Sequence, residues 1–181
     1  MKKLIGIVFL IFITSFSYSQ QKYAIVDSEY ILENIPEYLA AQDKLDEYSI
    51  EWQEEIEAKF KEIDSLYKTF QTESVLLPED VKLKKEEEII AKEKEAKALQ
   101  KKYFGKEGEL YKKRQELTKP IQDKVYNAIE EYATEGVYGV IFDKSGSLTM
   151  LYVNSKLDKS DDILAKLGYK PGTVNEKTKE E

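Results

Sequence analysis

The stretch LDEYSIEWQEEIEAKFKEIDSLYKTF, residues 45–70, decides the fold of this chain. Its apolar residues recur every three or four positions, with a mean step of about 3.6, which is the period of an α-helix with one apolar stripe. The stripe consists of Leu45, Tyr48, Trp52, Ile56, Phe60, Ile63, Leu66 and Phe70. Most positions between them are polar or charged, so the sequence predicts a long helix that buries a single face.

Three prolines divide the helical region into two arms of equal length. Pro36, Pro78 and Pro120 lie 42 residues apart, and proline suits the first turn of a helix but interrupts a helix interior. The sequence therefore predicts a hairpin of two antiparallel helices over residues 36–119, with its tip near residues 75–80. At a rise of 1.5 Å per residue, each helix would be about 63 Å long.

Folding the chain at Pro78 also predicts the register between the two arms. Partner residue numbers would sum to about 156, which brings Pro36 beside Pro120 at the root of the hairpin. The predicted contacts are Trp52 with Tyr103 and Phe104, Leu45 with Leu110 and Tyr111, and Tyr67 with Ile89 and Ile90. Charge favours the same pairing, because residues 37–77 carry a net charge of −7 and residues 79–119 a net charge of +3.

Two glycines lie inside the second arm, where each costs a helix about 1 kcal/mol relative to alanine. Gly105 and Gly108 have two interpretations. They could form a flexible segment that lets the arm move, or they could be small residues that leave room for Trp52 and Tyr48 of the first arm. The sequence leaves both interpretations open.

The residues outside the hairpin predict a small β-rich body, formed by residues 20–35 and 120–168. Its expected elements are a strand at Lys22–Val26, a helix at residues 29–33 capped by Ser28 or Asp27, a β-hairpin of residues 136–144 and 148–154 around Ser145-Gly146-Ser147, and a helix at residues 160–167, capped by Ser160 and closed by Gly168. Both faces of the hairpin strands are apolar, so we expect one face in the subunit core and the other in a subunit interface. The predicted fold class is α+β, mostly α: a long antiparallel coiled-coil hairpin on a small β-rich body. Residues 169–181 lack an apolar period and are predicted to be disordered.

The composition excludes several kinds of catalysis. None of the 181 residues is His or Cys, so a thiolate nucleophile, a Ser-His triad and a Cys/His zinc site are impossible. A carboxylate enzyme would have to use Asp27 and Asp143, and no other catalytic group is expected near them. The carboxylates of residues 86–88 point in different directions on a helix and do not make a calcium site. We therefore predict no enzymatic activity, no cofactor and no metal site.

The first residues predict export. Lys2 and Lys3 precede an apolar run at residues 4–13, and Ser17 and Ser19 suit a cleavage site, so residues 1–19 read as a cleaved signal peptide. The apolar run would be about 15 Å long as a helix, which is too short for a hydrocarbon layer of about 30 Å. Loss of both lysines takes the net charge from −7 to −9. Such an acidic chain is not expected to bind nucleic acid.

Several stretches together resemble the Skp/OmpH family of periplasmic chaperones. They are VDSEYIL (26–32), KPIQDKVYNAIEEYA (119–133), GVIFDKSGSL (139–148) and SDDILAKLG (160–168), combined with the signal peptide and the proline-delimited charged hairpin. The resemblance implies a periplasmic homotrimer whose subunits jointly build the body, with three helical hairpins around a cavity that holds unfolded outer-membrane proteins without ATP. Better-known members have basic arms, whereas residues 36–120 here carry a net charge of −4. Contact with lipopolysaccharide is therefore not carried over, and membrane contact is expected to be transient.

Two sets of residues are candidates for these roles. Client-binding candidates are Val75, Leu76 and Leu77 at the tip and Phe70, Tyr103 and Phe104 on the arms. Trimer-interface candidates are Tyr23, Ile25, Val140, Phe142, Met150 and Tyr152. The alternatives are that the arm residues pack within the hairpin and that the tip leucines cap their own turn. The alternative function is that of a structural periplasmic coiled-coil adaptor that binds a folded envelope partner.

Overall fold

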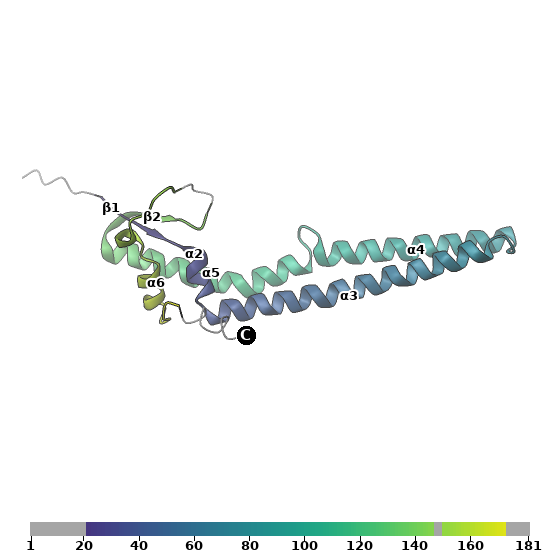
Figure 1. The fold of residues 1–181 in the computed structure, drawn as a ribbon, viewed down its shortest axis with the longest axis horizontal. Coiled ribbons are helices and arrows are strands. Elements are labelled where there is room, and N and C mark those ends of the chain that lie inside the picture. Colours follow the sequence, from purple (N-terminus) through teal and green to yellow (C-terminus); the bar gives the residue numbers. More distant parts are fainter. Residues whose placement is uncertain (1–20, 147–149, 173–181) are drawn as a thin grey trace, which may run out of the picture.

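The computed structural model describes residues 21–146 and 150–172, which form a long two-helix arm on a small body (Figure 1). The arm consists of α3 (Pro36–Glu73), which runs outward, and of α4 (Glu79–Phe104) and α5 (Glu109–Gly136), which return. The remaining elements are β1 (Lys22–Val26), α2 (Ser28–Glu33), β2 (Tyr138–Asp143), the 3₁₀-helix η1 (Ser155–Leu157) and α6 (Ser160–Lys166). The chain is thus mostly helical with a small sheet, as predicted. The predicted signal peptide lies outside the described residues.

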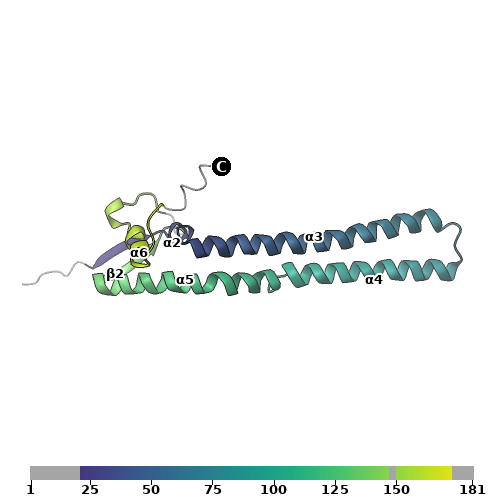
Figure 2. The same cartoon turned by 90° about the horizontal axis from the view of Figure 1, so that it is seen from below.

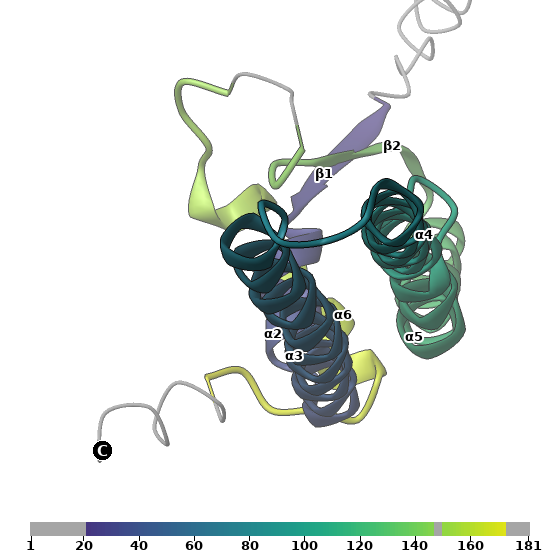
Figure 3. The same ribbon diagram turned by 90° about the vertical axis from the view of Figure 1, so that its right-hand side faces the viewer.

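The outgoing helix α3 begins and ends where the sequence indicates. Pro36 occupies its first turn, and the helix continues for 38 residues before the tip. The two sides of the arm run side by side along its length (Figure 2) and remain separate rods in a view along the arm from its tip (Figure 3). The buried positions of α3 are Ala41, Leu45, Ile56 and Ile63. They belong to a single stripe, so α3 is held by one face against the returning helices.

The returning side of the arm is broken into two helices. α4 ends at Phe104, residues 105–108 loop away from α3, and α5 begins at Glu109 (Figure 1). A Cβ on Gly105 would collide with the carbonyl oxygen of Lys101, and a Cβ on Gly108 would lie 2.7 Å from that of Tyr103. The expectation of one continuous second helix is therefore wrong here. These glycines are needed because the loop folds back on its own backbone, not because an aromatic ring of α3 requires the space.

The loop changes the register between the two sides of the arm. On its tip side Trp52 stacks on Tyr103, as predicted, with ring centroids 4.7 Å apart. On its root side the Lys113 ammonium lies 5.8 Å from the centre of the Tyr48 ring. The residue numbers of the Trp52–Tyr103 pair sum to 155, close to the predicted 156, whereas those of the Tyr48–Lys113 pair sum to 161. A uniform register is therefore wrong, because the loop residues lengthen the returning chain without advancing it along the arm.

The shift changes the predicted contacts at the root of the arm, and one predicted pair near the tip is not buried. At the root, Ile35 shares a core cluster with Val125, and Pro120 lies within α5 rather than beside Pro36. In this register Leu45 no longer lies opposite Leu110 and Tyr111, although it remains buried. Near the tip, Ile63, Ile89 and Ala96 form a buried cluster with Leu66 and Phe70 packed against it. Tyr67 and Ile90, which were expected to pair, are each half exposed.

The body contains a parallel two-stranded sheet with one covered face. β1 and β2 pair with Ala24 beside Ile141 and Val26 beside Asp143 on the inner face. The inner face packs on a core of α2, α5 and α6 side chains, of which Ile31, Ile163 and Leu164 are fully buried. Asp27 caps α2 by accepting a hydrogen bond from the Tyr30 N–H, so of the two predicted caps Asp27 is the one used.

Two predictions about the body need correction. Met150 to Asn154, the described part of the expected second hairpin strand, is irregular; residues 147–149 lie outside the described residues. A strand requires a pairing edge, and within the described residues of the single chain this segment has none. The end of the chain was expected to be disordered from residue 169, yet Tyr169 packs against the core cluster.

Replacing Gly108 with alanine is expected to destabilise the arm by about 1–3 kcal/mol, because the new Cβ would collide with backbone carbonyls that cannot move independently. Trp52 is the single tryptophan and lies on Tyr103 beside the loop, so urea unfolding followed by its fluorescence measures the effect. Gly146→Ala is the matched control, since nothing lies within 4 Å of its Cβ. Equal stability of both variants would contradict this account of the loop.

Candidate client-binding and assembly surfaces

The tip of the arm presents the most exposed of the predicted client-binding residues. Val75 and Leu76 are 86% and 87% exposed, whereas Leu77 is half-buried in the turn. The Leu76 N–H donates to the Glu73 carbonyl, and Pro78 precedes the first residue of α4, so the backbone of the turn is fixed. Two large apolar side chains are thus held in solvent at the end of the molecule, and Leu77 alone fits the alternative of a self-capped turn.

The predicted arm residues are divided between packing and exposure. Phe70 packs against the tip-side cluster, and Tyr103 stacks on Trp52 while its hydroxyl donates to Glu55 at 2.8 Å. That hydrogen bond, with burial and the surrounding carboxylates, raises the pKa of Tyr103. Phe104 is 38% exposed at the end of α4. Tyr103 and Phe70 therefore serve mainly the arm itself, and Phe104 keeps an accessible ring.

Charge complementarity joins the two sides of the arm. Lys92 of α4 contacts Glu62 of α3 at 2.7 Å, and Lys85 contacts Glu73 at 2.8 Å. The Lys92 pair raises the pKa of the lysine and lowers that of the carboxylate. Lys59 and Glu95 form a pair of opposite polarity at 3.0 Å. All of these pairs are solvent-accessible, so they orient the helices more than they stabilise them.

The outer face of the sheet carries most of the predicted interface residues. Tyr23 pairs with Val140 and Ile25 with Phe142, which places all four on the face opposite the core. Tyr23, Val140 and Phe142 are 41–52% exposed. Ile25 is 7% exposed, and residues 158–159 pair with its backbone, with Lys159 donating its N–H to the Ile25 carbonyl. Ile25 is therefore largely buried within the single chain, unlike the other three.

Val137 and Leu151 are exposed apolar residues of the body that the sequence analysis did not identify. Val137 has φ 54° and is 76% exposed, and Leu151 is 96% exposed, next to Tyr152 at 84%. Left-handed backbone is unfavourable for a β-branched residue. Gly136 is the last residue of α5, and a Cβ there would strike the Tyr138 ring. Met150, the remaining predicted interface residue, is half-buried.

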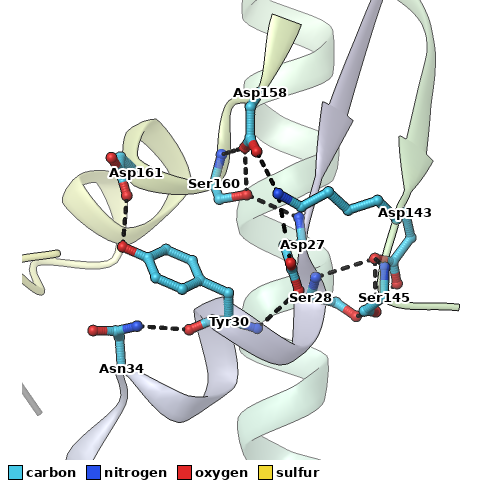
Figure 4. Close-up of polar contacts among 10 residues, drawn as sticks. Asp27, Ser28, Tyr30, Asn34, Asp143, Ser145, Asp158, Ser160 and Asp161 are labelled. Atoms are coloured by element: carbon cyan, nitrogen blue, oxygen red, sulfur yellow. Dashed lines mark hydrogen bonds and ion pairs between the residues drawn. The ribbon is translucent and has the colours of Figure 1, made fainter. Parts of the chain in front are cut away.

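A polar cluster ties β1, β2 and α6 together (Figure 4). The Lys144 ammonium lies 2.7 Å from Asp158 and 3.5 Å from Asp27. Ser160 donates its hydroxyl hydrogen to Asp158 and accepts the N–H of Asp27. Ser160 was expected to cap α6 but is its first helical residue. Its buried hydroxyl instead links Asp158 to the backbone of Asp27.

The carboxylate of Asp143 closes the turn after β2. Its oxygens accept hydrogen bonds from the N–H and hydroxyl of Ser28 and from the hydroxyl of Ser145. Burial alone would raise the pKa of Asp143, but these hydrogen bonds outweigh it and lower the pKa below its ordinary value. Asp27 and Asp143, the acids of the carboxylate-enzyme alternative, are thus both occupied by structural contacts (Figure 4). The described residues contain no cluster of three metal-ligating side chains.

Replacing Lys144 with methionine is expected to cost the body about 1–2 kcal/mol, because Asp27 and Asp158 would lose a charged partner in a partly buried site. Burial alone would raise the pKa of Asp158, but the hydrogen bonds from Lys144 and Ser160 outweigh burial and lower that pKa from 3.8. The hydrogen bond to Asp158 raises the pKa of Lys144 from 10.5. The stabilisation by Asp158 is therefore present above about pH 4 and lost as pH falls through its folded pKa. Thermal melts should show the difference from the unsubstituted chain shrinking at pH 3. A constant difference from pH 7 to pH 3 would contradict the assignment.

The structure is thus a long helical arm on a small sheet-containing body, with exposed apolar side chains at the tip and on the outer sheet face. Residues 22–167 match the family described as "Outer membrane protein (OmpH-like)". The chain belongs to this OmpH-like family.

Two known proteins are similar to this chain. An uncharacterized protein of Aquifex aeolicus (strain VF5) is 32% identical over 167 residues, which cover 92% of this chain and 96% of the relative. The fold is similar to the crystal structure of an OmpH-like protein of Caulobacter crescentus CB15, whose proposed role is that of an outer membrane chaperone. That similarity has a TM-score of 0.64 at 13% identity and covers 82% of this chain and 85% of the other.

Proposed function

We propose that this protein is an ATP-independent holdase of the periplasm, which binds unfolded outer-membrane β-barrel proteins between its helical arms and prevents their aggregation. The observation that carries the proposal is the pair Val75 and Leu76, which lie almost fully exposed at the end of a long arm. Such side chains have no use in the fold of the arm. They suit weak apolar contact with another chain.

The client chemistry follows from what a barrel protein exposes before it folds. Its strands alternate apolar and polar side chains, and in water the apolar ones drive aggregation. A holder that lacks an energy source must bind weakly at many points, so that the client can leave when it reaches the membrane. Exposed apolar groups spread along an arm meet this requirement: Val75 and Leu76 at the tip, and Phe104 near the middle.

We further propose that three copies assemble through the outer face of the sheet. Tyr23, Val140 and Phe142 form a partly exposed apolar surface there, and Met150 and Tyr152 lie on the irregular segment after β2. The unpaired backbone of that segment would acquire a partner in the assembly. Three arms joined at their roots would then surround a common cavity, with export directed by the signal peptide at residues 1–19.

The tip supplies a direct test. Leu76→Ser should weaken client binding several-fold while leaving stability within about 0.5 kcal/mol, since the side chain is 87% exposed. The assay is the suppression of light scattering when a urea-unfolded outer-membrane barrel is diluted into buffer. Tyr126→Ser is the matched control, because it removes an exposed apolar side chain from the body on the side away from the proposed interface.

The outcomes separate the possible functions. Loss of suppression in the tip variant alone supports client contact at the tip. Equal loss in both variants would place the client on the body, and no suppression by the unsubstituted protein would overturn the holdase. Stoichiometric binding to a folded envelope protein without any effect on unfolded chains would instead favour the adaptor.

A further inference from the structure

The chain continues beyond the family match and returns to the root of the arm. The match ends at residue 167, and the following residues 168–172, here called the strap, run from α6 toward the point where α2 meets α3 (Figure 1). That point consists of Asn34 and Ile35, here called the elbow, which are the only two residues between the helices. The strap therefore links the end of the body to the start of the arm.

The turn that begins the strap is fixed by backbone hydrogen bonds. Gly168 has φ 87°, a left-handed conformation that glycine adopts without strain. Its N–H donates to the Ala165 carbonyl, and the Tyr169 N–H donates to the Leu164 carbonyl at 2.9 Å. This is the Schellman pattern of a helix C-terminus, and it sends the chain back across the body. The direction of the strap is thus set locally by α6.

The strap contacts the elbow itself and the first turn of α3. The Gly172 N–H donates to the Asn34 side-chain oxygen at 2.9 Å, while the Asn34 amide donates to the Tyr30 carbonyl within α2. The Tyr169 hydroxyl donates to Glu37 in the first turn of α3 at 3.0 Å. Asn34 is 1% exposed, so loss of the Gly172 contact would leave a buried oxygen without that partner.

We propose that the strap sets the direction in which α3 leaves the body and thereby limits how far the arm can open at its root. The returning side of the arm needs no such device, because α5 continues without interruption from the arm into the body core. The outgoing side turns through the two-residue elbow, which the strap contacts directly at Asn34. The proposal concerns the single chain and does not depend on clients or on assembly.

The experiment removes both strap contacts while it keeps the turn that closes α6. The test variant ends at Lys170 and carries Tyr169→Phe, so that it loses the Gly172–Asn34 and Tyr169–Glu37 hydrogen bonds but retains the packed ring. The control chain ends at Thr173 and keeps both. Hydrogen exchange of peptides spanning residues 33–40 should be roughly fivefold faster or more in the test variant and unchanged in the control.

A distance measurement separates a change of direction from a general loss of stability. The chain has no Cys, so Leu76→Cys and Lys156→Cys allow spin labels at the tip and in the body, diluted with unlabelled chain. The tip-to-body distance distribution should broaden in the test variant at unchanged helix content. An unchanged distribution and unchanged exchange would overturn the proposal, as would an equal acceleration of exchange throughout the body.

Discussion

Removing the outer arm is expected to abolish the suppression of client aggregation while the body remains folded and assembled. The contact between Tyr48 and Lys113 marks residues that lie level with each other on the root side of the Gly105–Gly108 loop. A deletion of residues 49–112, closed by a Gly/Ser linker of about four residues, therefore joins matched ends. A cut based on a uniform register would join ends at different levels along the arm.

The body should survive this deletion because its core lies elsewhere. The buried cluster of Val26, Ile31, Ile163 and Leu164 is intact, and Tyr38 and Ile121, which pack against it from the arm root, are retained. The truncated chain should still melt cooperatively, and holdase activity should fall to the level of a protein-free control. Full activity in a folded, assembled truncation would contradict binding by the arms and would place the client on the body.

Replacing Phe142 with aspartate is expected to dissociate the proposed trimer. Burial of a phenylalanine contributes about 2–3 kcal/mol per subunit, and aspartate would place a charge in the interface, so the assembly should weaken by more than 100-fold. The single chain should tolerate the change, because Phe142 is 41% exposed on the outer face. Sedimentation velocity at micromolar concentration measures the loss of assembly, and far-ultraviolet circular dichroism checks that the subunit stays folded.

The control for this variant lies on the other side of the sheet. Tyr126 is 66% exposed on α5 and lines a hollow with Val26 and Ile141, whose side chains belong to the inner face. Tyr126→Asp should therefore remain assembled. Dissociation of the Tyr126 variant together with a stable assembly of the Phe142 variant would mean that subunits meet through the helical side of the body.

The helices could be predicted from the sequence because their signals are local. The 3.6-residue stripe, Pro36 in the first turn of α3 and Pro78 before α4 act within one turn of helix. The stacking of Trp52 on Tyr103 followed from the same signals, because it lies between the tip and the loop. Over this length the two helices have no insertion between them, so counting residues from the tip is sufficient.

The features that the sequence did not predict depend on distant contacts. Gly105 and Gly108 are compatible with a helix, a hinge or a loop, and their neighbours in space decide which one forms. The expected strand at residues 148–154 has strong β propensity, but a strand also needs an edge to pair with. The contact between Tyr169 and Glu37 joins residues 132 positions apart, and no periodic pattern indicates it.

The candidate surfaces follow the same division. Exposure of Val75 and Leu76 could be predicted because a turn between antiparallel helices has no neighbour to cover it. Burial of Ile25, which is 7% exposed on the same face as Tyr23, could not, because it depends on the rest of the fold and not on the alternation along the strand. Alternation along a strand identifies which residues share a face, whereas the rest of the fold decides which of them remain accessible.

The most direct test is the mass in solution of residues 20–181, the chain proposed to remain after signal-peptide cleavage, by light scattering coupled to gel filtration, with and without a urea-unfolded outer-membrane barrel protein. We expect the mass of three subunits for the protein alone. With the client, we expect a soluble complex whose mass is larger by one unfolded barrel chain. A single-subunit mass at micromolar concentration, together with aggregation of the client as if the protein were absent, would contradict both the trimer and the holdase.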